Sequence, residues 1–307
     1  MAAQKRKAAA VAGKQMDLFV ALAVDVPLRD QADTMERPFF SLSKTPRTEP
    51  IIYETESCSV EVRGSDGTGI ATIWDADILI WAASQITAAT NQGRPTSGVL
   101  QVSAYQLLRA IRRPTGGEDY VRLREALSRL LRTNVKTTIR SGPKRRIMFN
   151  WLQSWKEEPD SAGKPYLTIH LADWFYQGVI DMGRVLAIDE RYFDLTGGLA
   201  RWLYRVARKH AGNQQAGWRL SMATLHAKSG STQRPSDFAR DIRKIVKANA
   251  LPSYWLSLEM DAGGESLHMV RRSFLAHDHP GYEWLPESMV SADRPHLSTG
   301  VEAAIGG

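Results

Sequence analysis

The sequence has little cysteine and no long apolar run, and each absence excludes a class of protein. A single cysteine, Cys58, in 307 residues excludes an internal disulfide framework and favours a reducing cytoplasm. No stretch approaches the roughly 18 apolar residues of a membrane span. The amino terminus also lacks the apolar core and cleavage site of a secretory signal. We therefore expect a cytoplasmic protein that does not bind membranes.

Motifs for catalysis are also scarce. The glycine-rich turn GSDGTG lacks the Gly-Lys-Ser/Thr ending of a nucleotide-binding loop and does not open a helix. The histidines of HDH, residues 277–279, flank Asp278, whereas rolling-circle nicking enzymes place an apolar residue between two metal-binding histidines. A solvated loop fits this segment better than a metal site. We expect a non-enzyme without metal or cofactor.

Acidic residues are scarce in two long segments. Residues 94–156 carry 14 Lys and Arg against 3 acids, and residues 201–251 carry 11 against 2. The rest of the chain has a net charge of −13, although the whole chain is at +7. Two basic blocks in an otherwise acidic protein indicate two electrostatic footprints, and nucleic acid is the common polyanionic partner of such blocks.

The local patterns predict an α+β protein with two similar domains. Residues 1–34 are expected to be mostly disordered, because Lys5, Arg6 and Lys7 are followed by small residues and later by the polar stretch Pro27–Asp33. FFSLS, PIIYETES and SVEVRG read as strands, and three helices follow, within 75–90, 103–113 and 117–132. Strands are then expected in NVKTTIR, RRIMFNWLQSW and PYLTIHL. Three more helices and a hairpin repeat this order from residue 198 to 271.

The third helix of each set carries the same pattern. Apolar residues recur at i, i+4, i+7 and i+8 from Leu123 in the first and from Phe238 in the second, with cations opposite. Helix, helix, basic helix and hairpin is the order of a winged helix, whose third helix can enter the major groove. We therefore predict tandem winged-helix domains over 35–183 and 184–275, followed by a tail over 276–307. The predicted DNA-binding residues are cations of these helices and of the turn SGPKRR: Arg122, Arg129, Arg132, Lys144, Arg145, Arg146, Arg234, Arg240, Arg243, Lys244 and Lys247.

Several longer stretches resemble one protein family. ERPFFSLSKTPR, IIYE and ATIWDADILIWAASQI, together with YVRLREALSRL and LTGGLARWLYRVARKH, are similar to the replication initiator protein A family of bacterial plasmids. The resemblance implies a protein that binds repeated or palindromic origin sites and helps to open the duplex. It also implies recruitment of the host initiator and replicative helicase, and a homodimer that represses the initiator's own gene.

The amino-terminal stretch QMDLF stands apart from its alanine-rich surroundings. Gln15, Met16, Asp17, Leu18 and Phe19 resemble the pentapeptide that binds the bacterial sliding clamp. In a disordered tail, the apolar side chains of such a peptide can fill pockets on a partner. The alternative is an apolar segment that packs onto the first domain.

Two functions stay open on the sequence alone. The leading interpretation is a plasmid replication initiator, and the other is a dimeric winged-helix repressor, which needs only duplex binding. The clamp-like pentapeptide favours the initiator. The sequence does not determine whether the first domain mainly binds DNA or mainly forms the dimer.

Overall fold

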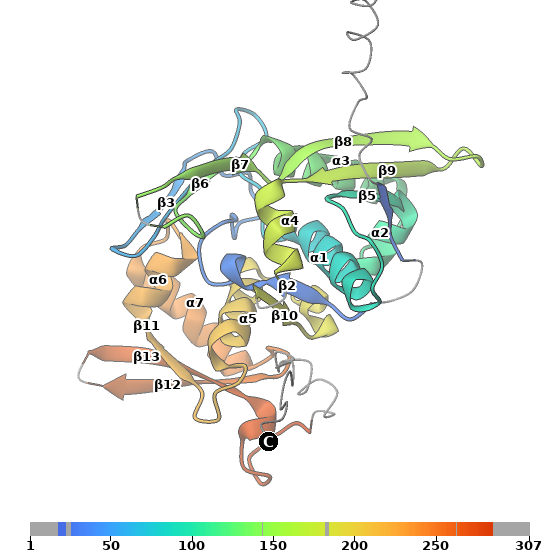
Figure 1. Cartoon of the computed structure of the whole chain (residues 1–307). Helices are drawn as coiled ribbons and strands as arrows, with labels where there is room; N and C mark the ends of the chain where they lie inside the picture. Colours follow the sequence, from blue (N-terminus) through green and yellow to red (C-terminus); the bar gives the residue numbers. More distant parts are fainter. Residues whose placement is uncertain (1–17, 23–25, 143, 182–183, 262, 285–307) are drawn as a thin grey trace, which may run out of the picture.

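The computed structural model describes residues 18–22, 26–142, 144–181, 184–261 and 263–284, which form a mixed α+β structure (Figure 1). The α-helices are α1 (Ala76–Asn91), α2 (Ala104–Ala110), α3 (Gly117–Arg132), α4 (Asp173–Ile180), α5 (Gly198–Ala211), α6 (Met222–Ser229) and α7 (Pro235–Ala248). The strands of the first half are β1 (Leu18–Val20), β2 (Arg29–Gln31), β3 (Ile51–Glu54), β4 (Ser59–Arg63), β5 (Val99–Ser103), β6 (Asn134–Thr137), β7 (Ile147–Asn150), β8 (Leu152–Pro159) and β9 (Pro165–Leu171). Those of the second half are β10 (Val185–Ala187), β11 (Trp218–Ser221), β12 (Tyr254–Asp261) and β13 (Gly264–Arg271). Within these ranges, every helix is too short or too polar to span a bilayer.

The same order of elements occurs twice along the chain. The first unit runs α1, β5, α2, α3 and the hairpin β8–β9, and the second runs α5, β11, α6, α7 and the hairpin β12–β13. The strand orders also agree, because the lone strand pairs with the second hairpin strand in both: β5-β9-β8 and β11-β13-β12. The strands β5 and β11 were not expected from the sequence.

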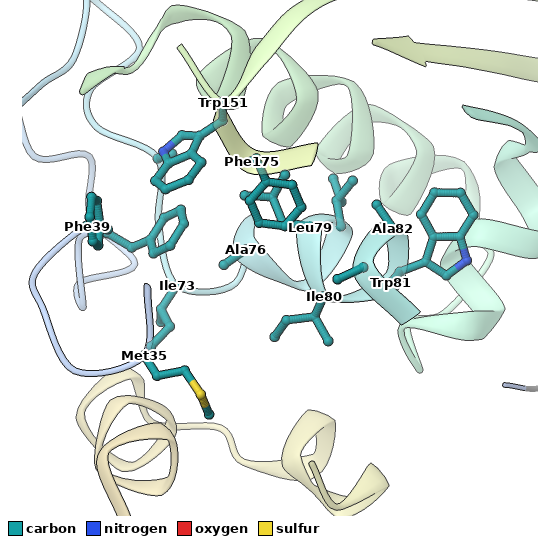
Figure 2. Packing of buried hydrophobic residues seen from close by; sticks show 14 of the residues in the cluster. Met35, Phe39, Ile73, Ala76, Leu79, Ile80, Trp81, Ala82, Trp151 and Phe175 are labelled. Carbon is teal, nitrogen blue, oxygen red and sulfur yellow. The ribbon is translucent and has the colours of Figure 1, made fainter. Parts of the chain in front are cut away.

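Helix α1 lies inside the first unit, and this explains its unusual composition. Ile78, Leu79, Ile80 and Trp81 are consecutive residues, and all of them are at most 3% exposed. A helix that is apolar on every side is one that is covered on every side. Figure 2 shows residues of this helix packed with side chains from several other segments, including Trp151 and Phe175. The family-like stretch ATIWDADILIW therefore belongs to the core.

Strands β6 and β7 are inserted between α3 and the hairpin β8–β9. Together with β3 and β4, which precede α1, they form a second four-stranded sheet, the inserted sheet β3-β4-β6-β7. The segment RRIMFNWLQSW, expected as one strand, is split between the two sheets: β7 ends at Asn150 and β8 begins at Leu152. Trp151 at the break is fully buried, and its ring stacks on that of Phe40 at 4.7 Å. FFSLS forms no strand, and Ser41 makes only an isolated bridge to Thr72.

The segment expected to be a disordered tail is largely structured where it is described. Residues 1–17 lie outside the described residues, but Leu18–Val20 pairs in parallel with Val99–Gln101 as the edge of the first sheet. Arg29–Gln31 pairs with Val185–Ala187, and Asp30 and Gln31 are buried. For the described residues 18–22 and 26–34 the expectation of disorder was wrong, because strand pairing with distant segments, the buried side chain of Phe19 and the buried Asp30 hold them in place.

Residues typical of helix ends lie at the ends of α2, α6 and α7. Ser103 and Ser221 accept backbone N–H bonds at the starts of α2 and α6, Gly230 ends α6 at φ +63°, and Pro235 opens α7. Asp75 precedes α1 but makes no capping bond to it. Its carboxylate accepts the Thr72 N–H and, as described below, binds an arginine of α3.

Candidate nucleic-acid interface

The exposed side of α7 is strongly basic. Phe238, Ala239 and Ile242 bury the opposite side against the second unit, which fixes the direction of the polar residues. The cations predicted on this helix and at its start are all exposed: Arg234, Arg240, Arg243, Lys244 and Lys247. Because the buried face holds the helix in place, the exposed cations can bind the phosphates of a polyanion without a change in the fold.

Most of these cations have only weak partners. Arg240 pairs with Asp237 at 2.8 Å and Lys244 with Asp241 at 3.1 Å, both three residues away on the same helix. Exposed pairs of this kind contribute little free energy and are screened by salt. Phosphate groups can therefore replace these acids at small cost.

The corresponding helix α3 uses its cations differently. Arg122 is exposed and pairs with Glu118 and Asp119 at the first turn. Arg132 is exposed as well. Arg129, however, donates from Nε and Nη2 to the two oxygens of buried Asp75, at 2.8 and 2.9 Å. These bonds raise the pKa of Arg129 and hold α3 against the start of α1. The sequence predicted Arg129 as a DNA contact, whereas the structure shows its guanidinium bound to Asp75 inside the unit.

The turn SGPKRR lies at the tip of the hairpin β6–β7. Lys144, Arg145 and Arg146 are exposed there, as expected for a surface that contacts phosphate. The turn was expected at the tip of the wing of the first winged helix. In the structure it joins β6 and β7, which belong to the inserted sheet and not to the hairpin β8–β9. These three cations therefore do not occupy the hairpin that ends the first unit.

The hairpins that end the two units are acidic instead. The hairpin β8–β9 and its turn carry Glu157, Glu158 and Asp160, and β12–β13 carries Glu259 and Glu265. Carboxylates repel the phosphate backbone at close range. The exposed cations of α7 and of the β6–β7 turn therefore lie outside these two hairpins.

Many cations of the two basic blocks form internal ion pairs with acids from the segment 30–77. Asp30 accepts from Arg205 Nε at 2.7 Å, and Asp77 accepts from Arg201 Nη1 at 2.7 Å, and both pairs are almost completely buried. Cations that pair with this acidic segment are Arg113, Arg129, Arg140, Arg201, Arg205, Lys209 and Lys228. The block charges therefore overstate the charge that is displayed. The excess of acids outside the blocks was the available signal of this pairing.

Glu36 joins the segment before β3 to the second unit. Its carboxylate contacts Lys209 Nζ and His210 Nε2, each at 2.8 Å, and also Lys228. Burial alone would raise the pKa of Glu36, but the hydrogen bond with His210 and the two lysines hold this pKa well below its usual range. Glu36 is thus ionised at neutral pH and bridges α5 and α6.

The clamp-like pentapeptide lies at the edge of the described chain. Gln15, Met16 and Asp17 fall outside the described residues, and Leu18 and Phe19 are in β1. Phe19 is 4% exposed and belongs to the hydrophobic core. The structure therefore agrees with the alternative of an apolar segment packed onto the first unit, at least for this phenylalanine.

The two histidines of the HDH segment contact nearby aromatic rings and backbone. The ring of His279 meets Trp255 edge-on at 4.9 Å, and its Nδ1 accepts the N–H of Gly281 at 2.9 Å. His277 contacts the ring of Tyr282 at 4.5 Å. In the part of the chain that the structure describes, no three His, Cys, Asp or Glu residues gather in a metal-binding arrangement.

Comparisons with known proteins agree on one family. The family model for replication initiator protein A matches residues 29–256. A protein of Wigglesworthia glossinidia brevipalpis that is named for a role in replication is 32% identical over 248 residues, which cover 78% of this chain and 89% of that protein. Among solved structures, a crystal structure of domains 2 and 3 of RctB is similar with a TM-score of 0.54 and 11% identity, over 76% of this chain and 94% of that one. A second structure of the same RctB domains gives a TM-score of 0.50. The RctB likeness concerns the fold alone, whereas the family match and the relative concern the sequence. The chain belongs to the replication initiator protein A family.

Proposed function

We propose that this protein initiates plasmid replication by binding duplex DNA at the origin through the exposed face of α7. The observation that carries the proposal is the set of exposed cations on this helix, which is anchored by Phe238 and Ile242 on its opposite side. Family membership supports the initiator role, and the basic face supports the mode of binding.

We also propose that the two units are tandem winged helices. In both units a helix, a strand, two helices and a hairpin follow one another, and the sheet orders correspond. In this arrangement α3 and α7 are the third helices, and a third helix is the element that enters the major groove.

The mechanism that we propose is binding without bond-making. Lysine and arginine neutralise phosphates and release counterions, which gives affinity that falls steeply with salt. Arginine can in addition donate two N–H groups to the edge of guanine. A nicking assay on supercoiled plasmid with divalent metal tests the absence of catalysis, because nicked product would contradict it.

Origin opening, recruitment of the host initiator and helicase, and repression of the initiator's own gene as a homodimer are further parts of the proposal. Clamp binding through Gln15–Phe19 is a weaker part, because Phe19 lies in β1 and its side chain is buried in the hydrophobic core. For this contact, β1 has to leave β5. Phe19→Ala therefore separates the two roles: a loss of thermal stability indicates packing, and lost clamp binding at unchanged stability indicates a partner site.

A plasmid maintenance test addresses the function directly. A selectable fragment carries the gene with its flanking DNA and no other origin. We expect colonies to keep it as a circle, and a frameshift in the gene to abolish this. The double variant Arg240→Ala, Lys247→Ala should lose maintenance. A matched control, Lys156→Ala with Lys164→Ala on the hairpin β8–β9, removes the same charge and should keep it.

Each other outcome has a definite meaning. If no circle forms although the wild-type protein binds the flanking duplex, the protein is a repressor that shares the α7 surface. If the control variant and the α7 variant behave alike, α7 is not the DNA-binding element.

A further inference from the structure

One cation on the basic face of α7 is held in a different way from the others. Arg243 donates from Nε and Nη2 to the two carboxylate oxygens of Glu265, at 3.0 and 2.6 Å. Glu265 lies on β13, so the bond joins the helix to the hairpin. Arg240 and Lys244 pair only with acids of α7 itself. Arg243 is therefore tied to a second element, and its neighbours on this face are not.

The geometry of this pair fixes the guanidinium. Two parallel N–H···O bonds in a plane define both the position and the orientation of an arginine side chain. The backbone position of Glu265 is fixed, because this residue of β13 pairs with Met260 of β12. About half of the Arg243 side chain is exposed. The fork occupies two of the five N–H groups, and three remain for a ligand.

Stability does not account for such a pair. Both side chains lie at the surface, and exposed ion pairs contribute little to folding. The pair instead affects what Arg243 can bind. A phosphate competes with Glu265 for the guanidinium and must displace a bidentate partner, whereas a base edge requires a donor whose direction is fixed.

We propose that Glu265 is a positioning residue that sets DNA specificity. It holds Arg243 so that the arginine reads a base edge, and it makes Arg243 a poor general contact for phosphate. The inference rests on the proposed function, because it requires that α7 faces DNA. Lys244 and Lys247 then supply the affinity that is independent of sequence, and Arg243 supplies discrimination.

The hairpin offers a matched control for this proposal. Glu259, on β12, makes the same kind of fork with Arg219 of β11. Glu259→Gln removes the same charge from the same hairpin as Glu265→Gln, but it releases no cation of α7. A general change in the electrostatic field of the hairpin affects both variants equally, and a specific release of Arg243 affects only one.

The experiment measures the binding of the full chain to two duplexes across a range of salt. One duplex is the segment of flanking DNA that the wild-type protein protects in a footprint, and the other is a shuffled duplex of equal length and composition. Glu265→Gln should raise affinity for the shuffled duplex about three- to tenfold, and its salt slope should steepen by about 1. Affinity for the protected duplex should change less, so the specificity ratio falls.

Two controls and two contrary outcomes test the role of Glu265. Glu259→Gln should leave the specificity ratio unchanged, and Glu265→Gln should have no effect on the ratio in an Arg243→Ala background. If Glu265→Gln keeps the wild-type ratio while the wild-type protein discriminates, the inference is wrong and the proposed function stands. If the wild-type protein protects no segment of the flanking DNA in the footprint, the inference and the proposed function fail together.

Discussion

The helices α3 and α7 occupy the same place in their units, yet they present different charges to solvent. Leu123 of α3 and Phe238 of α7 start the two apolar stripes, 115 residues apart. At this offset, four exposed-side positions of α7 correspond one by one to positions of α3. The pairs are Glu125 and Arg240, Ser128 and Arg243, Arg129 and Lys244, and Arg132 and Lys247.

The difference concerns both the number of cations and what they contact. All four α7 positions are cationic and exposed, whereas the four α3 positions hold an acid, a serine, an arginine that is bound to Asp75 and a single exposed arginine, Arg132. One fold unit can therefore have the pattern of a DNA-binding helix while its charge serves internal structure. We therefore propose that α7 makes the main DNA contact and that α3 makes a lesser one.

The largest effect that tests this comparison is on stability. Arg129→Ala leaves the buried Asp75 carboxylate without its ionic partner, and breaking such a pair costs about 3 kcal/mol. We expect the free energy of unfolding in urea to fall by this amount, with little change in the salt slope of DNA binding.

The variant at the corresponding position, Lys244→Ala, should behave in the opposite way. Its exposed side chain contributes little to folding, so unfolding is unchanged, but the salt slope should fall by about 1. If Arg129→Ala reduced DNA affinity and spared stability, the division between internal and displayed cations would be wrong.

The second test concerns the internal cations of the second basic block. The pKa of Glu36 is held low in the folded chain and returns to about 4.5 on unfolding, so its contribution to stability is present above this value and is lost as pH falls below it. Glu36→Gln should cost about 2 kcal/mol at pH 7. It should also flatten the decline of stability below about pH 4.5. Thermal unfolding of both proteins between pH 3 and 7 measures this.

The exposed pair of Asp241 and Lys244 on α7 provides the control for the pH-dependent unfolding of Glu36→Gln. Asp241→Asn removes a carboxylate that is bonded to Gln233 and Lys244 at the exposed surface of α7. Its stability profile should follow that of the wild-type protein closely. Equal profiles for all three proteins would show that the Glu36 cluster contributes nothing to the junction of the two units.

Local signals in the sequence predicted the hairpins and every described α-helix except α4, Asp173–Ile180, which was not predicted. Apolar spacing located both third helices, and Ser103, Ser221, Gly230 and Pro235 marked helix ends, because these signals act within a few residues. Leu123, Leu127 and Leu130 are buried as the spacing predicted.

Several differences between the predictions and the structure involve partners far apart in the chain. Arg129 looked like a surface cation because Asp75 lies 54 residues away, and Phe19 looked free because β1 pairs with residues near 100. The short strands β5 and β11 were missed because they become strands only by pairing with distant hairpins. Charge counts likewise cannot separate a cation that faces solvent from one that faces Asp30 or Asp77.

The smallest expected effect tests whether α3 faces DNA at all. Glu125 is exposed and corresponds to Arg240, so Glu125→Arg gives α3 one of the charges that α7 has. If α3 lies near the duplex, affinity should rise about threefold and the salt slope should steepen by about 1. Glu158→Arg makes the same charge change on the exposed part of β8 and should alter the slope less. Equal salt slopes for the two variants would place α3 away from DNA. The first unit would then be the candidate for contacts between two copies of the chain. Sedimentation of the wild-type protein tests this by measuring whether it forms a dimer.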